Sequence, residues 1–241
     1  MKYVKPINEF WGDVLKRDLL GETREEDKFR SKKELQEYLK SEIKKQGENV
    51  VIRDLDVSLI EDLSGLFKDI VNEVKSLDLS GWKTSGAKDM GWMFFQCNSI
   101  ESLDLSGWDV SNVNSMINMF FSSQNLKSLN LSGWDTSSVK LMAGMFHYCT
   151  KLKSLDLSSW DVSKVFTMEG MFYSCSSLES LDLSGWDISN VKNMCVMFYD
   201  CENLKSLDLS GWDTSNVIGM RGMFSNCPAP YTVIDNKLLR K

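Results

Sequence analysis

A hexapeptide of the form Leu-Asp-Leu-Ser-Gly-Trp recurs along the chain and constrains its fold more than any other feature. It occupies residues 77–82, 103–108, 181–186 and 207–212, with near copies at 129–134 and 155–160. Successive copies end 26 residues apart, at Trp82, Trp108, Trp134, Trp160, Trp186 and Trp212. A fixed period of this length is typical of a solenoid, in which each repeat stacks only on its neighbours.

Each repeat divides into two halves, as residues 126–149 illustrate. In the first half, Leu129 and Leu131 alternate with polar residues, which predicts a strand, and Ser132-Gly133 then turns the chain. In the second half, apolar residues recur at steps of three and four: Val139, Met142, Met145, Phe146 and Cys149. That spacing predicts a short helix. We therefore expect an α/β solenoid with one parallel strand and one short helix in each 26-residue coil.

The segments outside the regular repeats predict caps. Residues 7–20 and 31–46 have the apolar spacing of amphipathic helices, and the second begins with a capping box of Ser31 and Glu34 and stops at Gly47. We expect a two-helix N-terminal cap over 1–47, a degenerate first coil over 48–76, six repeats over 77–227, and a C-terminal cap and tail over 228–241. The first coil is one residue longer than the others.

Three sets of residues recur at fixed repeat positions and are predicted to form the core. The tryptophans and the Met-x-x-Met pairs are expected inside, because indoles weigh heavily in core energetics and thioethers fill gaps between packed elements. Five of the six cysteines share one register, with Ser123 in the missing place: Cys97, Cys149, Cys175, Cys201 and Cys227. We expect buried thiols, although neighbouring coils would also allow occasional disulfides.

Composition limits the possible partners and locations. A net charge of −6 and a pI of about 5.0 argue against nucleic-acid binding. The apolar runs are too short to span a membrane. No signal peptide opens the sequence, so we expect a cytoplasmic protein, or a cell-surface protein if a leader or anchor has been removed. With one histidine and no Cys-x-x-Cys pair, we expect no metal site, no cofactor and no catalysis.

A polar row on the predicted strands is the candidate binding site. Its members alternate outward at the same repeat position: Asp78, Asp104, Asn130, Asp156, Asp182 and Asp208. Carboxylates about 4.8 Å apart repel one another, so neighbouring serines such as Ser76, lysines such as Lys75, a cation or a basic partner must offset the repulsion. A second row, Asp109, Asp135, Asp161, Asp187 and Asp213, precedes each expected helix and is interpreted as helix capping.

The repeat unit resembles a known pattern. Leu-x-x-Leu-Asp-Leu-Ser-Gly-Trp-Asp-(Thr/Val)-Ser-Asn-Val-x-x-Met-x-x-Met-Phe-x-x-Cys, which covers 74–227, is similar to the 26-residue repeat of BspA-like bacterial surface proteins. The resemblance implies a right-handed leucine-rich-repeat-like solenoid, a surface location and a role in adhesion and protein binding. It brings no enzymatic residues.

Three functions are compatible with these observations. The first is a monomeric, non-catalytic module that binds a protein partner, in an adhesion-type interaction, through its strand face. The second is a passive spacer whose stack only sets a length. The third is carbohydrate binding at a cell surface. Nearly invariant serines beside the aspartates favour a spacer or a repetitive ligand over a highly specific site.

Overall fold

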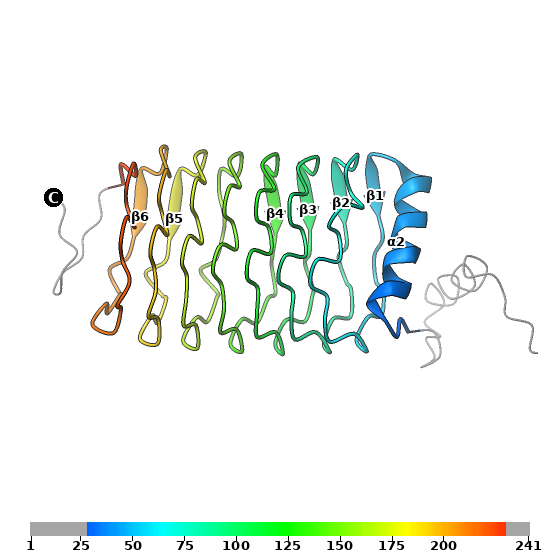
Figure 1. The fold of residues 1–241 in the computed structure, drawn as a ribbon, viewed down its shortest axis with the longest axis horizontal. Helices are drawn as coiled ribbons and strands as arrows, with labels where there is room; N and C mark the ends of the chain where they lie inside the picture. The colour runs from blue at the N-terminus through cyan, green and yellow to red at the C-terminus, as the bar shows by residue number, and fades with distance from the viewer. Residues whose placement is uncertain (1–27, 230–241) are drawn as a thin grey trace, which may run out of the picture.

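Successive coils of the chain stack side by side into a solenoid in the computed structural model, which describes residues 28–229 (Figure 1). One helix, α2 (Lys32–Gln46), precedes the coils. The strands are β1 (Asn49–Val51), β2 (Ser76–Asp78), β3 (Ser102–Asp104), β4 (Ser128–Asn130), β5 (Ser180–Asp182) and β6 (Ser206–Asp208). The predicted strand half of the repeat is therefore present, but each named strand is only three residues long.

All the strands pair in parallel and in the predicted register. They form one sheet in the order β1-β2-β3-β4 and a second of β5 and β6. Leu77 lies opposite Leu103, 26 residues on, whereas Val50 lies opposite Leu77, 27 residues on. The longer first coil is thus accommodated without a register slip. The predicted solenoid of parallel strands is confirmed.

The prediction of a short helix in every coil is wrong, because the second half of the repeat is a run of tight turns. Alternate backbone N–H groups there bond across to the next coil: Gly144 to Glu169 O at 2.8 Å, and Phe146 to Met171 O at 2.9 Å. The N–H groups between them close four-residue β-turns, as from His147 to Gly144 O at 3.0 Å. Bonds between coils therefore use donors that an α-helix would direct along its own axis.

The core is built from the predicted rows. All six repeat tryptophans are buried, from 1% exposed at Trp108 to 7% at Trp212. Trp82 and Trp108 stack with ring centroids 5.4 Å apart. The phenylalanine that follows each Met-x-x-Met pair forms a second stack, with Phe94 and Phe120 5.5 Å apart. Stacked aromatic pairs add stability beyond the area that they bury.

The cysteine row consists of free thiols, and those of Cys97, Cys149, Cys175 and Cys201 hydrogen-bond to a carbonyl of the preceding coil. Cys97, Cys149, Cys175, Cys201 and Cys227 are buried and unbridged, and Cys195, outside the row, is half-buried. The Cys175 thiol donates to Phe146 O at 3.1 Å, and the Ser123 hydroxyl donates to Phe94 O at 2.8 Å from the same repeat position. The prediction of small buried thiols is confirmed. Ser123 replaces a cysteine of the row and keeps the hydrogen bond from the side chain to a carbonyl of the preceding coil.

Helix α2 covers the N-terminal end of the stack (Figure 1). Its start and stop follow the sequence signals: the Ser31 hydroxyl accepts from Glu34 N, and Gly47 has a φ of 76°. The Gln46 side-chain amide accepts from Val51 N at 2.8 Å and donates to Val51 O at 3.2 Å, on the outer edge of β1. The helix predicted at 7–20 and residues 230–241 of the predicted C-terminal cap lie outside the described residues.

Candidate functional site

The six polar residues predicted on the strand face line up in the structure. Asp78 lies opposite Asp104, Asp104 opposite Asn130, and Asp182 opposite Asp208, each as the third residue of its strand. Asp156 holds the same repeat position in a coil whose residues form no named strand. The stacking of the coils therefore turns a sequence period into a row of polar groups on one face.

Each of these side chains is held by the serine two residues further on. Oδ1 accepts from that serine's backbone N–H, at 2.9 Å in Asp104 and 3.2 Å in Asn130. In Asp156 it also accepts from the Ser158 hydroxyl at 2.7 Å, and this bonding lowers the carboxyl pKa. Such local bonds are Asx turns, which fix the chain where it leaves the strand. The row therefore has a structural role, whatever else it binds.

The serines and lysines that were expected to offset the repulsion between these carboxylates bond to other groups. The Ser102 hydroxyl donates to the Ser76 hydroxyl at 3.0 Å, along the serine row itself. Lys75 pairs with Glu48 at 2.8 Å, and Lys127 pairs with Glu101 at 2.6 Å. These serines and lysines thus bond within their own rows, and each carboxylate of the site is held by the serine that follows its strand.

The charge along the row is uneven. At the N-terminal end the Arg53 guanidinium pairs with Asp78 and, as the largest cause, lowers its pKa. Sequence reasoning did not identify Arg53, because it lies in the degenerate coil where no repeat position flags it. Asn130 is uncharged. Among residues 28–229, no ion pair reaches the remaining C-terminal carboxylates, those of Asp156, Asp182 and Asp208.

These three carboxylates line one hollow of about 610 Å³ on the strand face. The residues around it are Leu129, Ser154, Leu155, Asp156, Ser180, Leu181, Asp182, Ser206 and Asp208. Its leucines matter, because Leu129 and Leu155 are only partly buried whereas Leu77 and Leu103 are buried. The hollow therefore combines an acidic rim with accessible apolar surface.

The hollow coincides with the interruption between the two sheets, next to Ser159. Gly81, Gly107 and Gly133 precede their tryptophans with φ values of 74°, 75° and 86°. Ser159 occupies the same repeat position and does not have a positive φ. Gly185 and Gly211, at the same repeat position in the next coils, also lack a positive φ, so the turn changes at this coil and stays changed. Residues 154–156 do not pair as a strand, whereas β5 and β6 beyond them do. The hollow thus lies at the coil where the turn changes.

The second aspartate row is structural, although its predicted helices are missing. Asp135 Oδ1 accepts from Ser137 N at 3.0 Å, and Asp187 Oδ1 accepts from Ser189 N at 2.9 Å. These Asx turns lower the pKa values of both carboxyls. They cap a tight turn at the position where helix capping was expected.

Over residues 28–229, no three or more His, Cys, Asp or Glu side chains gather as metal ligands would. No helix in that range has the length and apolar character needed to cross a membrane. The six repeat tryptophans, being buried, offer no platform for a glycan.

Parallel strands from successive coils, a repeated apolar core and a polar strand face define a leucine-rich-repeat-like solenoid. The chain belongs to the family DUF285, described as Mycoplasma proteins of unknown function, whose model matches residues 34–132 and 116–236. No curated protein matches the chain.

Two solved structures resemble the chain. The leucine-rich-repeat protein TpLRR of T. pallidum is 17% identical, with a TM-score of 0.32, over 66% of this chain and 70% of that one. A leucine-rich-repeat protein of Leptospira interrogans is 21% identical, with a TM-score of 0.34, over 65% of this chain and 42% of that one. The chain therefore spans less than half of the Leptospira protein.

Proposed function

We propose that this protein is a non-catalytic scaffold whose strand face binds a protein partner. The observation that carries the proposal is the hollow in which Asp156, Asp182 and Asp208 lie without an ion-pair partner among the described residues. Solenoids use such extended faces for binding. Carboxylates in register favour a partner with basic side chains, because complementary charge increases the association rate and specificity.

An adhesion-type role at a bacterial cell surface belongs to the same proposal. Its support is the resemblance of the repeats to those of BspA-like surface proteins. The rigid row of Asx turns supports it further, since binding would require little ordering of the face.

The test removes charge without removing the turns. Asn130 keeps its bond to Ser132 N, so Asp156→Asn, Asp182→Asn and Asp208→Asn together should preserve the fold while removing three charges. The matched control makes the same three substitutions in the second row, at Asp161, Asp187 and Asp213. We expect the strand-face variant to lose partners that wild type and control capture from the native source, as identified by mass spectrometry.

The outcomes separate binding from the spacer function. Partners lost only from the strand-face variant, with binding by wild type that weakens as salt increases, would support the proposal. The same proteins captured by all three chains would remove the strand face as a binding surface and leave a role in setting length.

A further inference from the structure

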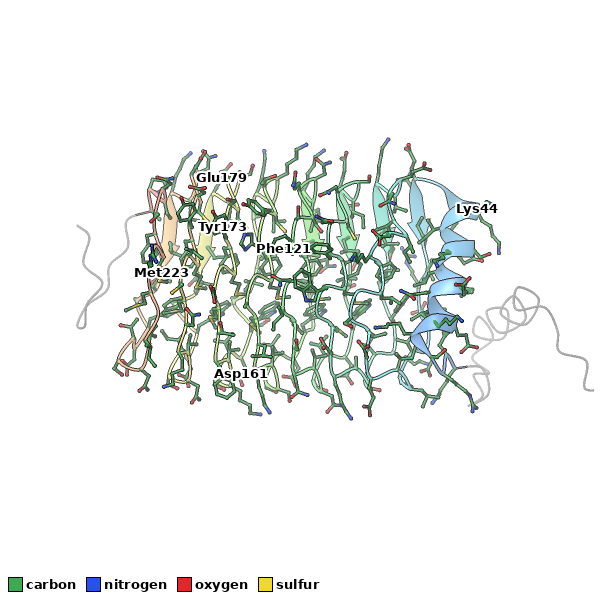
Figure 2. All side chains as sticks on the ribbon, viewed as in Figure 1. Lys44, Phe121, Asp161, Tyr173, Glu179 and Met223 are labelled. Carbon is green, nitrogen blue, oxygen red and sulfur yellow. The ribbon has the colours of Figure 1, made fainter. Side chains whose placement is uncertain are left out.

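A row of partly exposed aromatic rings runs across the coils on a part of the repeat distant from the strands. Its members follow the buried phenylalanine of each coil at steps of 26 residues: Phe95, Phe121, His147, Tyr173 and Tyr199. Figure 2 shows Phe121 and Tyr173 between the edge that carries Glu179 and the edge that carries Asp161. Solitary apolar residues on a surface need no explanation, but a contiguous patch does.

The rings of this row cover one another's faces. Centroids are 4.7 Å apart between Phe121 and His147, 4.3 Å between His147 and Tyr173, and 4.7 Å between Tyr173 and Tyr199. The last two pairs are close to parallel, at 14° and 8°. The row therefore presents mainly ring edges to solvent.

Two further rings lie across those edges. Tyr148 stands at 86° to Phe121 and 71° to Tyr173, and Trp92 stands at 70° to Phe95. Both rings therefore make edge-to-face contacts with the row. They are among the more exposed aromatic side chains, at 42% for Trp92 and 38% for Tyr148. We call the row with these two rings the aromatic strip.

The size of the strip excludes a second copy as its main occupant. It extends over four coil steps, roughly 20 Å at ~4.8 Å per step, and is one to two rings wide. Its exposed area is on the order of 300 Å², whereas a stable dimer buries about 800 Å² on each partner. A narrow ligand that lies along the strip fits this area better than another folded surface.

The chemistry of the strip favours an uncharged ligand that accepts hydrogen bonds. Burial lowers the pKa of His147 to about 4, so the rings of the row are uncharged at pH 7, while the Lys68 ammonium lies over the Phe95 ring, 5.4 Å from its centroid. The Trp92 indole N–H has no acceptor among residues 28–229, and the tyrosines carry hydroxyl donors. A polyproline II backbone offers carbonyls with no internal partner, which match these donors. The tyrosine hydroxyls also accept hydrogen bonds, so a sugar is the alternative occupant that the test includes.

We propose that the aromatic strip binds a proline-rich peptide in the polyproline II conformation. Trp92 and Tyr148 come from coils two steps apart and from repeat positions four residues apart, and both contact the Phe121 ring, at 5.9 and 6.0 Å between centroids. The two ring centroids therefore lie within about 12 Å of each other, and a polyproline II helix, which repeats every three residues at 3.1 Å each, or about 9 Å, can place successive turns on both. Aromatic-lined surfaces are a recurring mode of binding to such peptides.

The test uses a deca-proline peptide, with isothermal titration calorimetry on the full chain. Wild type should bind it, and Trp92→Ala or Tyr148→Ala should each weaken binding by about tenfold or more, as for an anchor residue. The matched control is Phe166→Ala, which removes an exposed ring (48%) at a different repeat position and should change affinity by less than about twofold. Thermal melts verify that all variants fold.

Three results would overturn the proposal. The first is no heat of binding for deca-proline at millimolar concentration. The second is equal weakening in the Phe166→Ala control. The third is a different occupant, seen either as a chitin oligosaccharide that binds in place of the peptide or as a dimer in sedimentation that Trp92→Ala disperses. Because the carboxylates of the strand face are unchanged in these variants, failure here is distinguishable from failure of the proposed function.

Discussion

Truncation of one stacked tryptophan measures how much the repeated core stabilises the fold. Trp108 is 1% exposed, stacks on Trp82, and donates its indole N–H to Leu79 O at 2.7 Å. For Trp108→Ala, loss of the ring costs ~3–5 kcal/mol. The unpaired buried carbonyl adds about 1 kcal/mol or more. Since a domain is stable by only ~5–15 kcal/mol, this variant comes close to unfolding.

A milder variant keeps the measurement quantitative. Trp108→Phe retains a ring over Trp82 but loses the donor to Leu79 O, so we expect a cost of about 1–3 kcal/mol. Trp92→Ala removes an exposed indole and should stay within about 0.5 kcal/mol. Urea unfolding followed by circular dichroism gives all three free energies of unfolding. Equal costs for Trp108→Ala and Trp92→Ala would refute the buried, stacked core as the source of stability.

Three further changes test other features. His147 has a folded pKa of about 4 against 6.5 unfolded, so its contribution to stability is complete above pH 6.5 and declines as pH falls toward 4. His147→Phe, which copies Phe121, should make the urea midpoint of unfolding depend less on pH over that range. The same dependence of the midpoint on pH in variant and wild type would contradict this prediction. Cys175→Ser should cost about 1 kcal/mol or less, because Ser123 makes the same bond, and Cys175→Val should cost more in the same assay. Ser159→Gly should leave amide hydrogen exchange at 154–156 unchanged, because Gly185 occupies the same repeat position without a positive φ while β5 still pairs; slower exchange in the variant would make Ser159 the cause of the sheet interruption.

The repeat period predicts most of the fold because stacking imposes one register on every coil. Leu77, Trp82 and Cys149 occupy their predicted inward positions, since a residue repeated at every step meets its own kind in the neighbouring coil. The pattern around Met142 and Phe146 misled us, because tight turns bring apolar residues inward at the same steps of three and four as a helix. Positive φ values at Gly144 and Tyr148 show where a helix cannot continue.

The candidate site was predictable in its position but not in its state. Asp156 and Asp182 could be placed on the strand face from spacing alone. Their hydrogen-bond partners could not be predicted. The Asx turns to Ser158 and Ser184 are local bonds, and they compete with the bonds to the neighbouring serine and lysine rows that the spacing also allows. The aromatic strip was missed, although Phe121 and its equivalents recur at 26-residue steps, because phenylalanine, histidine and tyrosine share no single letter in the repeat.

The Gln46 amide protects the edge of the first strand from pairing with other molecules. It offers Val51 one acceptor and one donor, which is what the peptide group of a further coil would offer. An open strand edge invites pairing with other chains and aggregation. The Gln46 side chain thus occupies the free backbone groups of Val51 at the exposed edge of β1. Gln46→Ala should therefore promote fibril-like association, detectable by light scattering, without moving any group on the lateral faces.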